Sequence, residues 1–95
     1  MSDITFPNDP LEIRKRKARF RAWHRGTREA DLVVGGFADR ELAGLGEPEL
    51  ELFESLLNET DADIVKWVTG ELPAPAHQEN AVVRRMIAQA RSLAT

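Results

Sequence analysis

The sequence contains no cysteine and only two histidines, His24 and His77. Without cysteine, disulfides, thiolate metal ligands and cysteine nucleophiles are all excluded. The two histidines are few and far apart along the chain, so we expect no metal site. No apolar run approaches the ~20 residues that span a bilayer, and the N-terminus lacks the basic and apolar regions of a signal peptide. We therefore expect a cytoplasmic protein with no segment inserted in a membrane.

The composition is typical of one small folded domain. The chain has 95 residues, of which 42% are hydrophobic and 31% are charged, and its formal net charge is -3. A chain of this size buries about 60 to 65% of the surface that it exposes when unfolded, which is enough for one core. We predict a flexible segment over residues 1–8 and a single helical domain over residues 9–95.

Positive charge is concentrated in one stretch of the chain. Residues 14–28 hold eight of the thirteen basic residues and no acid, whereas residues 29–79 hold thirteen acids and two bases. The eight are Arg14, Lys15, Arg16, Lys17, Arg19, Arg21, Arg25 and Arg28. Such a cluster could bind the phosphates of nucleic acid, which is one alternative function. The pI of about 5.4 and the lack of a DNA-reading motif argue against nucleic acid as the partner.

Periodicity and capping residues predict five helices and no strand. The first should begin at Asp9-Pro10, where the aspartate can cap the helix and proline suits its first position. Its apolar face is predicted to contain Ile13, Phe20 and Trp23. Gly26 should end it, because glycine adopts the left-handed conformation without penalty.

A second helix is predicted after Thr27, with acids in its first turn where the helix dipole favours them. Its predicted apolar residues are Leu32, Val33, Phe37 and Leu42. Gly35-Gly36 should weaken this helix by about 1 kcal/mol per glycine relative to alanine. The pair therefore indicates close packing of another backbone or a local irregularity.

Three further helices follow. The third comes after Gly44-Leu45-Gly46, a turn that lacks the third glycine of a dinucleotide-binding fingerprint and follows no strand. Its apolar face is predicted to be formed by Leu50, Phe53, Leu56 and Leu57. The fourth should extend from a cap at residues 60–63 to Gly70, with Trp67 in the core and Asp61 and Asp63 as cap acids rather than metal ligands. The fifth is predicted from about Glu79 to about Ser92.

The sequence Arg25-Gly26-Thr27-Arg28-Glu29 places opposite charges on either side of a helix break. An ion pair between Arg25 and Glu29 would only fasten the corner, and exposed pairs of this kind contribute about 0 to 1 kcal/mol. His24 could act as a general base, but no nucleophile is placed near it, so we interpret it as a surface or interface residue. Trp23 lies among basic residues and could anchor a partner, because tryptophan and arginine are enriched in binding hot spots.

This motif, together with Phe53-x-x-Leu56-Leu57 and Asp61-x-Asp63-Ile64-x-x-Trp67, resembles the succinate dehydrogenase assembly factor family, or flavinators, over residues 16–92. The resemblance implies a small all-α five-helix bundle that is not an enzyme. It would bind the flavoprotein subunit of succinate dehydrogenase, and of the related fumarate reductase, and promote covalent attachment of FAD. The FAD would belong to the partner, and this chain would bind no cofactor. A regulatory or antitoxin-like interaction module remains an alternative.

The resemblance places the family's motif residues on Arg25, Gly26 and Glu29. We expect the two charged residues to present fixed charges to the client, and the glycine to allow close approach of the corner. With their neighbours, the predicted partner-binding residues are Arg19, Trp23, Arg25, Gly26, Arg28, Glu29 and Asp31. The prediction requires that the Glu29 carboxylate be accessible. We expect the free protein to be a monomer.

Overall fold

The computed structural model describes residues 9–94, so the predicted flexible segment at residues 1–8 lies outside the described residues. Within this range the α-helices are α1 (Pro10–Trp23), α2 (Arg28–Glu41), α3 (Glu47–Leu56), α4 (Asp61–Thr69) and α5 (Ala81–Ala94). Two short 3-10 helices are η1 (Leu42–Gly44) and η2 (Ala76–Gln78). Residues 9–94 contain no strand, and the predicted all-α fold with five α-helices is confirmed. No helix among these residues is both long enough and apolar enough to cross a membrane.

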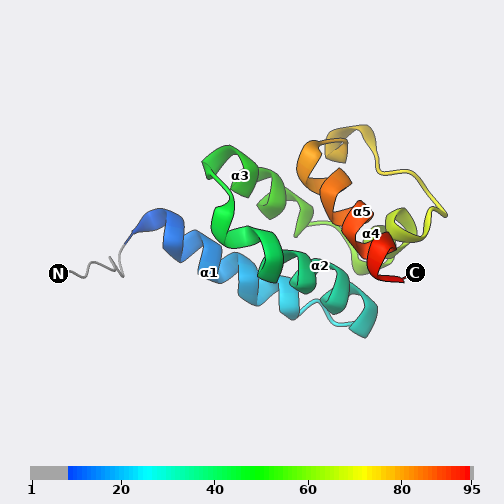
Figure 1. The fold of residues 1–95 in the computed structure, drawn as a ribbon, viewed down its shortest axis with the longest axis horizontal. Coiled ribbons are helices and arrows are strands. Elements are labelled where there is room, and N and C mark those ends of the chain that lie inside the picture. The colour runs from blue at the N-terminus through cyan, green and yellow to red at the C-terminus, as the bar shows by residue number, and fades with distance from the viewer. Residues whose placement is uncertain (1–8, 95) are drawn as a thin grey trace.

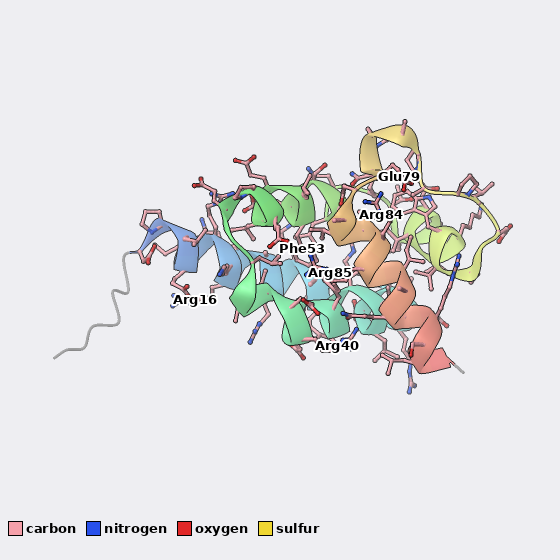
Figure 2. The ribbon with its side chains drawn as sticks, turned by 45° about the horizontal axis from the view of Figure 1, so that its top comes forward. Arg16, Arg40, Phe53, Glu79, Arg84 and Arg85 are labelled. Atoms are coloured by element: carbon pink, nitrogen blue, oxygen red, sulfur yellow. The ribbon has the colours of Figure 1, made fainter. Side chains whose placement is uncertain are left out.

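The helices form a bundle around one core. The α1 and α2 helices lie side by side and run in opposite directions, joined by a short corner at residues 24–27 (Figure 1). The α5 helix packs against α2, α3 and α4 and so closes the bundle. Figure 2 shows Phe53 pointing from α3 into the interior, where its ring centroid lies 5.7 Å from that of Phe37. The predicted α3 core residues are all buried, as is Trp67.

Most predicted helix ends are confirmed because their capping contacts are local. The Asp9 carboxylate accepts a hydrogen bond from the Leu11 amide at 2.9 Å, and Thr60 Oγ1 accepts one from the Asp63 amide at 3.2 Å. Gly70 follows α4 with a φ of 85°, as expected of a helix-ending glycine. The α5 helix begins at Ala81, two residues after the predicted start, because the Asn80 side chain accepts a hydrogen bond from the Val83 amide at 2.9 Å.

The predicted apolar face of α1 was wrong at Phe20, whereas Ile13 and Trp23 are half-buried. Phe20 is 64% exposed and stacks on His24 with ring centroids 3.9 Å apart. The face that packs on the bundle contains Lys15, Ala18 and Ala22, whose positions repeat at steps of three and four. The two alanines allow close packing because they are small, and Lys15 buries its stem while its Nζ donates to the Ala43 carbonyl at 2.9 Å.

The predicted face of α2 needs a smaller correction. Phe37 and Leu42 are buried as predicted, but Leu32 is 54% exposed. The face that packs into the core is instead formed by Ala30, Val34, Phe37 and Ala38. The expected close approach at Gly35 is present, although a side chain makes it and not a backbone: a Cβ on Gly35 would lie 2.3 Å from Cδ2 of Trp23.

Candidate partner-binding site

The corner between α1 and α2 is held in shape by its own residues. Gly26 has a φ of 112°, which side chains rarely allow. The Arg25 amide donates to Oδ1 of Asp31 at 2.7 Å, and the Ala30 amide donates to Oγ1 of Thr27 at 3.2 Å. The bond between Arg25 and Asp31 links the two sides of the helix break, and the bond between Ala30 and Thr27 caps α2. Together they fix the backbone conformation of the corner.

The Arg25 side chain is bound inside the protein. Its Nε lies 2.8 Å from Oδ1 of Asp61, its Nη1 donates to the Leu57 carbonyl at 2.6 Å, and its Nη2 donates to the Glu59 carbonyl. Only 8% of the side chain is exposed. The alternative of an ion pair between Arg25 and Glu29 was therefore wrong, since the arginine pairs with Asp61 at the start of α4. The expectation that its guanidinium presents charge to a client also needs correction, because these three groups already surround it.

The loop that receives Arg25 is fixed from its other side as well. Oε2 of Glu59 lies 2.9 Å from Nε2 of Gln78 and 2.8 Å from Nε2 of His77. The hydrogen bonds from Gln78 and His77 hold the pKa of the Glu59 carboxyl below its ordinary value. The corner is thus connected through Arg25 and residues 57–61 to η2.

Unlike the Arg25 side chain, which is bound inside the protein, Arg28 and Glu29 lie at the surface. Both lie in the first turn of α2, both are exposed, and neither forms an ion pair with any residue in the range 9–94. The accessibility of the Glu29 carboxylate that the sequence prediction required is confirmed. Asp31, the other acid of this turn, is partly buried and accepts a hydrogen bond from the Arg25 amide.

Trp23 and Arg19, which precede the helix break, both contact Asp39 of α2. Nε1 of Trp23 donates to Oδ1 of Asp39 at 3.2 Å, and Nε of Arg19 lies 3.9 Å from the same oxygen. Trp23 is half-buried because its ring covers Gly35. Of the two aromatic residues near the corner, Phe20 is therefore more available to a partner than Trp23.

Three shallow hollows surround the corner. The first is lined by Trp23, His24, Gly26, Thr27, Arg28, Asp31 and Leu32. The second lies between α2 and α5 and is lined by Glu29, Leu32, Val33, Arg40, Ala90 and Leu93. The third lies towards α4 and is lined by Thr27, Glu29, Asp61, Ala62, Val65, Lys66 and Glu71. Glu29 borders the second and third hollows, and Leu32 borders the first and second.

Most of the basic cluster is already engaged within the protein. Arg14 pairs with Glu47 and Glu54, and Arg21 donates to the Leu57 carbonyl and to Asn58. Lys15, Arg19 and Arg25 have the partners described above. Among the described residues, only three of the eight cluster members form no such bond, namely Arg16, Lys17 and Arg28. Residues 9–94 also contain no group of three or more His, Asp or Glu side chains placed to hold a metal ion.

Comparison with known proteins shows the family of this chain. A family model described as the flavinator of succinate dehydrogenase matches residues 16–90. The chain belongs to this family. The matched residues include the whole corner, residues 57–61 and every residue that lines the second hollow except Leu93.

Individual relatives of the flavinator family are similar over most of this chain. It is 36% identical over 83 residues to the FAD assembly factor SdhE of Acetobacter pasteurianus, which covers 87% of this chain and 76% of that protein. It is 41% identical over 69 residues to the mitochondrial succinate dehydrogenase assembly factor 2 of Saccharomyces cerevisiae strain YJM789, covering 73% of this chain. The chain spans 43% of that yeast relative and 54% of the corresponding protein of Drosophila grimshawi.

Two features of the corner and its hollows were missed in the sequence. Asp61 was interpreted only as a cap acid, although it is the ionic partner of Arg25. Leu93, at the end of α5, was not connected with the corner, although it lines the same hollow as Glu29. No pattern in the sequence relates residues so far apart, so local reasoning had no signal for either contact.

Proposed function

We propose that this protein is an assembly factor that binds the flavoprotein subunit of succinate dehydrogenase and promotes covalent attachment of FAD to it. The contact surface is centred on Gly26, Arg28 and Glu29. One observation carries the assignment: Glu29 is exposed and forms no ion pair within residues 9–94, on a corner whose backbone is held by Arg25, Asp31 and Asp61.

The internal bonds of Arg25 explain how the motif could work as a unit. They hold the corner before any partner arrives, so less conformational freedom is lost when Glu29 meets the client. Gly26 is exposed and has no side chain, so it leaves the backbone of the corner open to the client. In this proposal Arg25 supports the surface from within, while Arg28 and Glu29 make the contacts.

The chemistry of attachment would belong to the client and its flavin, and this chain would be a binding protein without substrate turnover. By binding one conformation of the client more tightly, it would shift the population towards the arrangement in which the flavin and the acceptor side chain are aligned. Such alignment can remove several kcal/mol from a reaction barrier, about 7 to 11 kcal/mol in favourable cases. No flavin-binding group is required of this chain.

We extend the proposal to the flavoprotein subunit of fumarate reductase, and to a monomeric, cytoplasmic protein. The first point rests on the resemblance carried by the motif at residues 25–29, and the other two rest on the composition of a small folded domain. The structure gives little support to nucleic-acid binding, because five of the eight clustered basic side chains already bind other groups of the protein. A salt titration with duplex DNA is expected to give no binding even at low ionic strength.

The test compares two isosteric substitutions, Glu29→Gln at the corner and Glu51→Gln on α3. Glu51 is an exposed glutamate outside the corner and its hollows, so it controls for the loss of one surface charge. Each variant is expressed in cells that lack the native gene, and flavin fluorescence is measured on the denatured flavoprotein subunit in a gel. Glu29→Gln is expected to lower the covalent flavin strongly, whereas Glu51→Gln is expected to leave it unchanged. Equal flavin in the deletion strain and in its parent would show that the proposed function is wrong.

A further inference from the structure

Two exposed leucines from distant parts of the chain meet in one groove. Leu32 of α2 is 54% exposed and Leu93 of α5 is 71% exposed, and both line the hollow between these helices together with Val33 and Ala90. A single exposed leucine is ordinary on a protein surface. A groove lined by apolar side chains from two helices is instead typical of a binding site. We call the hollow lined by these four residues, Glu29 and Arg40 the α2–α5 groove.

The two ends of the α2–α5 groove carry opposite charges. Glu29 and Arg40 are eleven positions apart on α2, which is about 16 Å along the axis and returns nearly to the same face. Neither residue forms an ion pair with any other described residue. Arg40 is directed towards α5, where its Nε donates to Oε1 of Gln89 at 2.7 Å (Figure 2). The groove therefore has an acidic end, an apolar middle and a basic end.

We propose that the α2–α5 groove receives an aliphatic segment of the flavoprotein subunit, with a basic side chain placed at Glu29 and an acidic one at Arg40. The inference rests on the proposed function and extends its surface beyond the corner. An extended segment of about five residues would reach from one charge to the other at about 3.3 Å per residue. Aliphatic side chains would fill the space between Leu32 and Leu93.

The position of Glu29 favours the client as the occupant. Because Glu29 borders both the corner and the groove, a protein that contacts its carboxylate covers the acidic end of the groove as well. A second copy of this chain is the other occupant to consider, since an antiparallel copy would also place Arg40 at Glu29. That arrangement would cover the carboxylate that the client needs. Four apolar residues also provide far less than the roughly 800 Å² per partner of a standard stable interface.

The experiment measures the affinity of the full chain for the purified flavoprotein subunit by titration calorimetry. The variants Leu32→Ser and Leu93→Ser remove the apolar contacts, and Leu72→Ser is the control because Leu72 is an exposed leucine outside the groove. We expect each groove variant to bind about tenfold more weakly, as is usual when an anchoring side chain is removed. Binding by the control should be unchanged. Urea unfolding of Leu93→Ser should match the parent, since this side chain is mostly exposed.

A charge variant tests the orientation of the bound segment. Arg40→Gln removes the basic end, and it is expected to weaken binding and to reduce the dependence of affinity on salt concentration. Arg84→Gln is the control, because Arg84 is exposed at the start of α5 and pairs locally with Glu79 (Figure 2). The control is expected to change neither quantity.

The possible results distinguish failure of the groove proposal from failure of the proposed function. If Glu29→Gln weakens binding while Leu32→Ser and Leu93→Ser bind as the parent does, the groove proposal is overturned and the proposed function stands. If neither Glu29→Gln nor deletion of the chain lowers the covalent flavin, the proposed function itself fails. If the leucine variants abolish a dimer in sedimentation but leave client affinity unchanged, the groove joins two copies of this chain, and the proposal is likewise overturned.

Discussion

The guanidinium of Arg25 lies 2.8 Å from the carboxylate of Asp61, and this pair joins the α1–α2 corner to the start of α4. Both side chains are mostly buried, and the same guanidinium also bonds the carbonyls of Leu57 and Glu59. The arginine of the motif is therefore a structural residue in the free protein. Its removal should affect the whole corner and not only one contact.

We expect Arg25→Met to lower the free energy of unfolding by about 2 to 4 kcal/mol, because two carbonyls and one carboxylate would lose their donor. Urea denaturation followed by circular dichroism measures the change. Arg28→Met is the control, since that exposed arginine forms no ion pair with residues 9–94 and should change stability by less than about 0.5 kcal/mol. Equal stability of the two variants would contradict a structural role for Arg25.

Gly35→Ala should destabilise the protein by about 1 to 3 kcal/mol or more, because the added methyl would collide with the ring of Trp23. Gly36→Ala is the matched comparison: its Cβ would approach only the flexible end of Arg40, at 3.3 Å. There the gain in helix propensity of up to about 1 kcal/mol should dominate. Thermal unfolding of both variants measures the difference. In a Gly35→Ala background, Trp23→Leu should recover part of the lost stability, and no recovery would show that the ring is not the cause.

Two glycines with positive φ allow stability to be separated from binding. Gly26 has a φ of 112° at the corner and Gly70 has a φ of 85° after α4. Alanine at either position should cost about 1 to 2 kcal/mol, because a Cβ is strained in this conformation. Only Gly26→Ala is expected to lower the affinity for the flavoprotein subunit, measured by calorimetry at a temperature where both variants are folded. Comparable losses of affinity in both variants would assign the effect to stability alone.

Stability should fall in acid because three glutamates are bound by donors in the folded state. The pKa of Glu54 is lowered by its hydrogen bond from Arg14, that of Glu41 by Gln89 and Arg85, and that of Glu59 by Gln78 and His77. A carboxyl whose folded pKa is depressed contributes stability that is present above its unfolded pKa of about 4.3 and is lost as the pH falls through the folded value.

Urea unfolding should therefore give a free energy that is nearly constant from pH 7 to about pH 5 and then decreases. Arg14→Gln removes the main donor to Glu54, and it should reduce the decrease below pH 5 relative to the parent. Stability that rises as the pH falls from 5 to 3 would mean that these carboxyls are not stabilised by their donors.

The number of helices and most of their ends could be predicted from the sequence, because the interactions that decide them are local. A cap such as Thr60 bonds an amide three residues ahead, and Gly70 ends α4 through its own conformation. The buried face of α3 could also be predicted, since its apolar residues are separated clearly from its acids.

The buried face of α1 could not be predicted in this way. That helix carries charge on all sides, and the large residue Phe20 is exposed while the small residues Ala18 and Ala22 are buried. Which face packs depends on the shape of α2 and α3, and this information is not in the α1 sequence.

The amino-acid sequence alone determined that this is a small α-helical protein with a glycine break between an arginine and a glutamate, because helix periodicity and capping act within a few residues. Only the tertiary structure decided that Arg25 is bound internally and that Glu29 is exposed at the end of a groove. Asp61, which binds Arg25, lies 36 positions from it along the chain, and Leu93, which lines the same groove as Glu29, lies 64 positions from Glu29. Packing alone brings these residues to the corner.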